Sequence, residues 1–304
     1  MLSRRIFVLL PVTQALFAAS DVSWILKLGG LVERDRSDDV VAVNLAGRWV
    51  NDSEMIDLAA LPKLERLDLS HTRISDEGLL HLRPARQIQD LNLLYAEQIT
   101  DQGMSAIRDW RALKTLNVRG TRIGDGTLAM VAKLPQLESL DIAATAVTEN
   151  GLAGLIPLTH LKRLALGRNR LPDKALEFLR FLQTLESLDL SGPGNVNRNA
   201  RRERATGLSE QLRRALAELK ELRVLKLGYT AVGAEELRKL GPALANVEKL
   251  GLENCTRVND EALRELGQPG QWRALKYLDV QETAVSQSGI ESLLKVKPAL
   301  KILK

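Results

Sequence analysis

The sequence predicts an α/β solenoid, a right-handed horseshoe with short parallel strands on the concave side and helices on the convex side. The main observation behind this prediction is a repeat, because the pattern Leu-x-x-Leu-x-Leu returns nine times, most often at a step of 24 residues. Copies begin at Leu64, Ile88, Leu113, Leu137, Leu161, Leu185, Leu222, Val247 and Leu275, with a looser copy at Val40 and a truncated one at Leu300. A fixed step of this length is typical of stacked units, each with one strand and one return segment.

The alternation inside each copy predicts the strand. In residues 64–82, Leu67 and Leu69 point to one face while Asp68 points to the other, because strand side chains alternate with a period of two. Five residues after Leu69 comes a further apolar residue, Ile74, which we expect to close the turn against the core. One face of every strand is therefore core and the other faces solvent.

The return segment is predicted to be helical. A small or polar residue followed by an acid, such as Ser75 and Asp76, suits a helix N-terminus, because both groups satisfy or neutralise its exposed amides. Apolar pairs three residues apart, such as Leu79 and Leu82, then place one helical face against the core. Each copy thus supplies a strand, a turn and a helix.

This repeat is the signature of a leucine-rich repeat solenoid. Residues 72–79 and 145–152 resemble bacterial leucine-rich repeat proteins with the motif Thr-x-Ile/Val-Ser/Thr-Asp-x-Gly-Leu, which are related to the cysteine-containing repeats of F-box substrate receptors. Cys255 stands where other copies have threonine, and its copy has the extra residue typical of the cysteine-containing kind. The resemblance implies the fold of about residues 22–304, but a scaffold hosts many functions and the resemblance names no partner.

The chain is expected to form one domain. Residues 1–20 resemble a secretory signal peptide, because Arg4 and Arg5 precede a short apolar stretch that ends in small residues. That stretch is too short to anchor the chain in a bilayer. The alternative is an N-terminal helix that covers the first repeat. We expect a solenoid over 21–304 with an N-terminal cap at 21–39, and we favour an exported or periplasmic protein over a cytoplasmic one.

The sequence shows no catalytic pattern. Three histidines are spread over four repeats without a recurrent carboxylate or nucleophile at useful spacing: His71, His81 and His160. Cys255 fills a repeat position, so we expect a buried structural thiol. Trp110 and Trp272 stand where other copies have leucine, so we expect them to pack in the core or at the rim. We predict no enzyme, no cofactor and no metal site.

The solvent-facing side of the strands is the first candidate binding surface. Asp or Asn fills most of its middle positions, and charged residues flank them. The predicted partner-binding residues are Arg66, Asp68, Asp90, Asn92, Asn117, Arg119, Asp141, Arg163, Asp189, Lys226, Lys249, Glu253, Tyr277 and Asp279. The alternative is that Asp and Asn are merely the common residues at this repeat position. Few aromatic anchors are present, which favours a polar partner over an apolar peptide.

An insertion is the second candidate binding element. Between Leu185 and Leu222 the step lengthens from 24 to 37 residues, and the added residues form a basic loop at 192–206. Insertions in a solenoid map to loops on one face. This loop carries four arginines, which recognise carboxylate and phosphate groups through paired hydrogen bonds: Arg198, Arg201, Arg202 and Arg204. A solvated loop without a partner is the alternative.

These features favour a non-enzymatic scaffold that binds a protein partner. The net charge of +5 permits an anionic partner without requiring one, so polyanion or nucleic-acid binding through the loop is a disfavoured alternative. A substrate-adaptor role like that of F-box proteins is a further alternative, which we disfavour because we expect no separate adaptor-binding domain before the repeats. Leu300, Ile302 and Leu303 begin another strand, so we also expect end-to-end self-association or a covering partner at this C-terminal edge.

Overall fold

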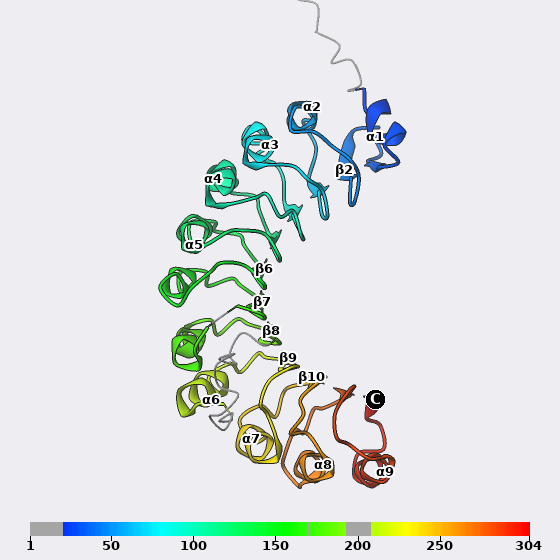
Figure 1. Cartoon of the computed structure of the whole chain (residues 1–304), viewed down its shortest axis with the longest axis vertical. Coiled ribbons are helices and arrows are strands. Elements are labelled where there is room, and N and C mark those ends of the chain that lie inside the picture. Colours follow the sequence, from blue (N-terminus) through cyan, green and yellow to red (C-terminus); the bar gives the residue numbers. More distant parts are fainter. Residues whose placement is uncertain (1–20, 170, 193–207) are drawn as a thin grey trace, which may run out of the picture.

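The computed structural model describes residues 21–169, 171–192 and 208–304, and it shows a curved stack of repeats (Figure 1). Strands of the described residues form one sheet in chain order from β1 to β12. The sheet lines the concave side of the curve and the helices cover the convex side, so the predicted leucine-rich repeat solenoid is confirmed.

The bounds of the elements follow the repeat. The strands are β1 (Leu31–Arg34), β2 (Val40–Asn44), β3 (Arg66–Asp68), β4 (Asp90–Asn92), β5 (Thr115–Asn117), β6 (Ser139–Asp141), β7 (Arg163–Ala165), β8 (Ser187–Asp189), β9 (Val224–Lys226), β10 (Lys249–Gly251), β11 (Tyr277–Asp279) and β12 (Lys301–Leu303). The α-helices are α1 (Ser23–Lys27), α2 (Glu54–Ala59), α3 (Asp76–His81), α4 (Asp101–Met104), α5 (Asp125–Val131), α6 (Glu210–Ala217), α7 (Ala234–Leu240), α8 (Asp260–Gly267) and α9 (Gln287–Val296). Among the described residues, the 3₁₀ helices are η1 (Ser105–Asp109), η2 (Leu152–Leu155) and η3 (Asp173–Phe181).

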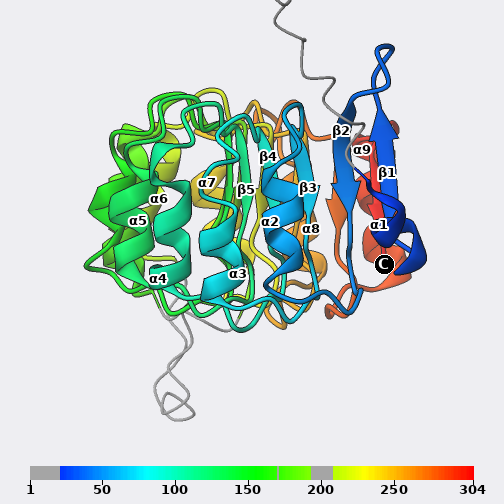
Figure 2. The ribbon, with the colours of Figure 1, turned by 90° about the horizontal axis from the view of Figure 1, so that it is seen from above.

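The sheet differs from the prediction at its first strand. From β2 onward each strand is parallel to its neighbour, but β1 pairs with β2 in the antiparallel direction. Figure 2 shows β1 beside β2 at the edge of the sheet. A strand that follows the cap directly can return only antiparallel, because a parallel strand needs a crossover of a dozen residues or more.

Equivalent leucines stack from repeat to repeat. Leu91 pairs with Leu116, and Leu116 pairs with Leu140 in the parallel register. Each is about 1% exposed, and the turn residue Ile74 is fully buried. Together they belong to one aliphatic core that runs the length of the solenoid. The predicted strand phase is therefore confirmed.

The acid of the motif joins each repeat to the next. The Asp76 carboxylate accepts hydrogen bonds from the backbone N–H of Thr100 at 2.8 Å and from its hydroxyl at 2.6 Å. A Cβ added at Gly103 would lie 2.4 Å from Asp76 Oδ1, so the motif glycine leaves room for this carboxylate. The same link recurs as Asp52 to Ser75, Asp125 to Thr148 and Asp260 to Ser286. Asp101 makes a variant of it, because it accepts from the N–H of Gly124 and from the hydroxyl of Thr127. The conserved spacing of this motif within the chain thus reflects contacts between repeats.

The first helix and three unusual side chains pack into the core. Ile25 of α1 is fully buried, and Gly29 ends the helix with a φ of 74°. Trp110 and Trp272 are fully buried, as is Cys255. In the described part of the chain no helix is long and apolar enough to cross a membrane.

Candidate functional site

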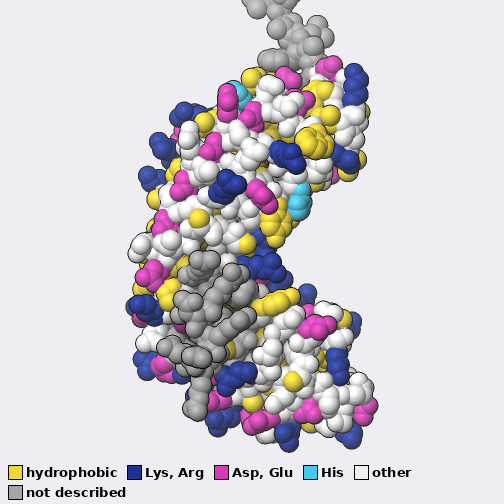
Figure 3. Space-filling model, in the orientation of Figure 1, with side chains coloured by type: hydrophobic (Ala, Val, Ile, Leu, Met, Phe, Trp, Pro, Cys, Tyr) yellow, Lys and Arg dark blue, Asp and Glu magenta, His cyan; other side chains and the backbone are white. Residues whose placement is uncertain are grey.

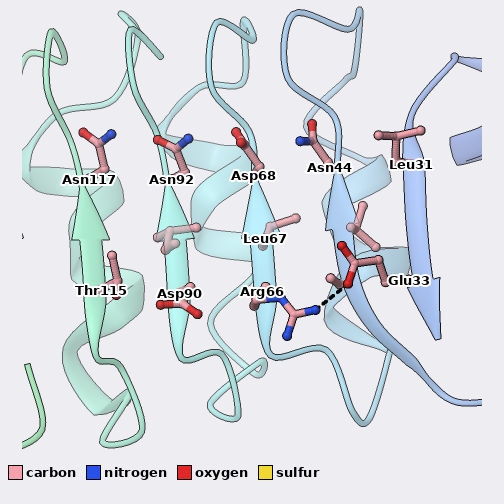
Figure 4. Close-up of a pocket in the computed structure, with 13 residues that line it drawn as sticks. Leu31, Glu33, Asn44, Arg66, Leu67, Asp68, Asp90, Asn92, Thr115 and Asn117 are labelled. Atoms are coloured by element: carbon pink, nitrogen blue, oxygen red, sulfur yellow. Dashed lines mark hydrogen bonds and ion pairs between the residues drawn. The ribbon is translucent and has the colours of Figure 1, made fainter. Parts of the chain in front are cut away.

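The structure places all fourteen predicted concave residues on the solvent side of β3 to β11 or just after a strand, and none is buried. Figure 4 shows Asp68, Asn92 and Asn117 in one row, with Arg66 and Asp90 in a parallel row. Parallel strands lie about 4.8 Å apart, so the side chains of each row are close neighbours. The sequence pattern therefore brings these residues together on one surface.

A groove of about 400 Å³ lies on this surface over β1 to β5. Arg66 bridges to Glu33 of β1 with its Nη2 atom 2.6 Å from Glu33 Oε2, at the N-terminal end of the groove. Asp68 and Asp90 also line the groove, and neither forms an ion pair with another described residue. After the pair of Arg66 and Glu33 is set aside, the remaining charged side chains of the groove, Asp68 and Asp90, are therefore negative.

The row that contains Asp68, Asn92 and Asn117 has a structural role that the sequence did not reveal. Asp68 Oδ1 accepts a hydrogen bond from the backbone N–H of Ser70 at 2.9 Å. The equivalent contact, from the N–H two residues later, recurs at Asn44, Asn92, Asn117, Asp141, Asp189 and Asp279. These Asx turns hold the exit from each strand and account for the frequency of Asp and Asn. Each such side chain keeps its second polar atom for other contacts.

Arg119 ties the middle of the concave surface together. Its Nε atom lies 2.9 Å from Asp141 Oδ2, and its Nη2 atom lies 3.5 Å from Asp189 Oδ2. The intervening strand β7 carries the small Ala165, which lets the side chain span this distance. Burial lowers the pKa of Arg119, but its hydrogen bond to the Asp141 carboxylate and the charges of Asp141 and Asp189 outweigh burial and raise the pKa. This arginine is permanently charged and already paired.

Acidic groups gather again over the C-terminal strands. Burial raises the pKa of Glu253, its own backbone N–H opposes this, and the charges of Asp279 and Asp189 raise the pKa further. Lys249 of β10 lies beside Tyr277 of β11, with its Nζ 5.1 Å from the centre of the Tyr277 ring. Tyr277 is 42% exposed and is the aromatic group of the predicted set.

The inserted loop holds the second set of predicted binding residues. Arg198, Arg201, Arg202 and Arg204 lie outside the described residues. The described residue that precedes the gap, Gly192, follows β8, so the insertion begins on the edge where strands lead into helices.

This edge carries residues that the sequence reasoning missed. Trp49 is 75% exposed, and Arg73 Cζ lies 4.5 Å from its ring centre. The rings of His71 and Tyr95 have centroids 5.3 Å apart, and Tyr95 is 37% exposed. We call Arg48, Trp49, His71, Arg73, Tyr95 and Arg122 the aromatic rim. Gly47 and Gly120 occupy the repeat position of His71 and Tyr95, and these glycines were the feature of the sequence that could have predicted a left-handed turn there.

The described residues contain no group of three or more His, Cys, Asp or Glu side chains that could hold a metal ion. Burial raises the pKa of the Cys255 thiol, and this thiol donates to the carbonyl of Leu227 at 3.1 Å. Its buried position in the repeat is therefore confirmed.

The fold and its open concave surface define the chain as a leucine-rich repeat solenoid. A model of the family described as Leucine Rich repeat matches residues 60–82. Solved bacterial structures share the fold at low sequence identity. An internalin of Listeria monocytogenes, InlF, is 19% identical with a TM-score of 0.56, over 82% of this chain and 69% of that one.

Two further structures give the same result. Internalin C2 of Listeria monocytogenes is 22% identical with a TM-score of 0.51, over 72% of this chain and 87% of that one. A leucine-rich repeat protein of Leptospira interrogans is 20% identical with a TM-score of 0.50, over 81% of this chain and 62% of that one. No protein with a curated description matches the sequence at a significant level. The bacterial leucine-rich repeat resemblance is thus confirmed at the level of the fold.

Proposed function

We propose that this protein is a non-enzymatic interaction scaffold that binds a protein partner through its concave strand face. The observation that carries the proposal is the row of unburied, mostly polar side chains from β2 to β11, interrupted at Ala165 and Gly251 and hollowed into a groove over β1 to β5. Chains with this fold are generally protein-interaction scaffolds, because a solenoid offers an extended concave surface for binding.

The charges of the groove indicate what the partner presents there. Asp68 and Asp90 form no ion pair with another described residue, whereas Arg66 forms one with Glu33. A partner lysine or arginine would form charge-assisted hydrogen bonds with these carboxylates. Amide groups would suit the neighbouring Asn92 and Asn117.

The four arginines of the inserted loop are a second proposed contact with the same partner. The alternative function is binding of a polyanion or nucleic acid through this loop, with a steep loss of affinity as salt increases. No observation in the described residues favours an adaptor role.

Affinity capture with the full chain, followed by titration of the purified partner, tests the concave face. The variant Asp68→Asn with Asp90→Asn keeps the turn hydrogen bond at 68 but removes both charges. We expect it to weaken binding about tenfold or more, since each 1.4 kcal/mol is a factor of ten. The control is Asp57→Asn with Glu261→Gln on exposed helix surfaces, which should bind like the wild type.

Replacement of Arg198, Arg201, Arg202 and Arg204 by Ser tests the loop in the same titration. Weaker binding with a flatter salt dependence supports the second contact. A partner that tolerates the concave variant and is lost with the loop variant would move the site to the loop.

A further inference from the structure

The aromatic rim combines features that its role in the repeat does not explain. Four strand-to-helix connections form this part of the edge: 45–53, 69–75, 93–100 and 118–124. Together they contain four arginines but only two acids, Asp52 and Glu97. Asp52 is engaged by Ser75 in the link between repeats. Arg119 is paired with acids of the concave face. The remaining arginines are left without a carboxylate partner among the described residues.

These free arginines are Arg48, Arg73 and Arg122, and all three are exposed. Arg73 packs over the Trp49 ring, which holds its guanidinium beside the most exposed large apolar side chain of the described residues. Such a pair offers apolar area and hydrogen-bond donors at one place, as binding hot spots do. Figure 3 shows basic and hydrophobic side chains next to each other along this N-terminal part of the edge.

The backbone at the rim holds the rings of His71 and Tyr95 on a left-handed turn. His71 and Tyr95 have φ values of 56° and 53°, in the left-handed region that favours glycine, and Gly120 takes the same position with a φ of 73°. Side chains other than glycine are disfavoured there. The Tyr95 ring lies over Gly120, where an added Cβ would be 2.2 Å from its Cδ1 atom. Later repeats fill the same left-handed position with Ala144, Arg168, Tyr229, Asn254 and Glu282, so the turn recurs and the two neighbouring rings distinguish the rim. The rings of His71 and Tyr95 form one aromatic patch.

We propose that the aromatic rim binds an acidic segment of a protein partner. The carboxylates of this segment contact Arg48, Arg73 and Arg122, and other side chains of the segment pack on Trp49 and Tyr95. Charge complementarity selects this occupant. Arginine forms paired hydrogen bonds with carboxylates and stacks on aromatic rings. The inference rests on the proposed function for the existence of a protein partner, but it places this contact on a different surface.

A nucleic acid would also be attracted by arginines and aromatic rings, but the adjoining surface opposes it. The concave face beside the rim carries Asp68 and Asp90, whose carboxylates form no ion pair with the residues that the structure describes and repel a chain with a charge on every phosphate. A polypeptide can present acids at the rim alone and basic or amide groups at the groove. The distribution of charge therefore favours a protein segment.

The test uses fluorescence anisotropy with the full chain and a labelled peptide rich in glutamate and leucine. A peptide with glutamine in place of glutamate and an oligothymidylate of equal charge are the comparison probes. We expect the acidic peptide to bind, and Arg73→Gln with Arg122→Gln to weaken it about tenfold or more, as the loss of one charge-assisted contact can produce. Trp49→Ala should also weaken it.

The matched control is Lys63→Gln with Arg83→Gln, which makes the same change of net charge at exposed positions on the opposite edge. It should bind the peptide like the wild type. Lack of peptide binding by the wild type, equal loss in the control, or tighter binding of the oligothymidylate would each overturn the proposal. If the rim variant still binds the partner and the concave variant does not, the proposed function stands and this inference fails; the reverse result retains the inference and rejects the concave site.

Discussion

Leu140 and Asp141 are neighbours on β6, and their contacts show how one strand separates stability from surface chemistry. Leu140 is 1% exposed, so Leu140→Ala should lower the free energy of unfolding by about 2–5 kcal/mol through lost burial and a cavity. Asp141 faces solvent, and the sequence alone predicts a cost well under about 1 kcal/mol for Asp141→Ala. Its bond to Ala143 N–H and its contact with Arg119 raise this expectation to about 1 kcal/mol.

Chemical denaturation of the two variants, with Asp141→Asn as a third, measures these effects. Asparagine keeps the turn hydrogen bond, so Asp141→Asn should lose less stability than Asp141→Ala. Equal losses for Leu140→Ala and Asp141→Ala would contradict the strand phase.

Glu253 should make stability depend on pH. Burial is the largest cause of its raised pKa, so the fold favours the protonated carboxyl. A raised folded pKa gives stability that is fully present below the unfolded pKa, about 4.3, and is lost as the pH rises through the folded value. Glu253→Gln resembles the protonated form, so we expect it to stabilise the fold at pH 7. Denaturation at pH 4 and below should show this gain disappear, and a gain that persists there would rule out titration as its cause.

At the scale of elements, the Asp76 link couples one helix to the next repeat. Asp76→Ala removes two hydrogen bonds to Thr100 and should cost about 1–3 kcal/mol. Gly103→Ala should cost about 1–3 kcal/mol, because the new Cβ meets the same carboxylate. The double variant should lose less than the sum, since removal of the carboxylate relieves part of the clash. Denaturation of all three variants gives the coupling energy, and strictly additive losses would show that the two residues act separately.

The chain contains a natural control for this link. The position of the motif glycine is Ala262 in α8, and the preceding repeat has Ala234 where the motif has an acid. Ala262→Gly should therefore relieve no clash and cost about 1 kcal/mol through its lower helix propensity.

At the scale of the whole molecule, the solenoid should tolerate removal of the insertion. Both flanks are fixed, because Gly192 N–H donates to the carbonyl of Gly228 at 2.9 Å and Ser209 N–H donates to Asp173 Oδ2 at 2.9 Å. Loop-closure entropy changes slowly with length, so deletion of 193–205 should change the free energy of unfolding by about 1 kcal/mol or less. Denaturation of the deletion variant checks this, and loss of a cooperative transition would show that the insertion supports the fold.

End-to-end self-association is a prediction for the whole assembly. Within the described residues, β12 pairs with β11 alone, and its Leu303 is 54% exposed. An unpaired strand edge is a template for pairing with another chain. Light scattering should show mass increasing with concentration, and Leu303→Lys should reduce the increase. A mass that stays monomeric at high concentration would exclude self-pairing.

The periodic part of the fold was predictable residue by residue. The spacing of Leu67, Leu69 and Ile74 determined the strand phase and the buried face, because a repeat of 24 residues returns each side chain to the same environment. It also placed the concave residues on one surface. The motif around Ser75 predicted a helix start, but not that Asp76 would bind the following repeat.

The sequence by itself thus determined the solenoid, its aliphatic core and the solvent-facing row of its strands. Only the tertiary structure decided the antiparallel β1, the reach of Arg119 to Asp189 and the position of Tyr95 over Gly120. The physical reason is that periodicity states which way a side chain points within its own repeat. Contacts between repeats depend also on the curvature of the stack, the lengths of side chains and the left-handed turns, and these are set when the repeats pack together.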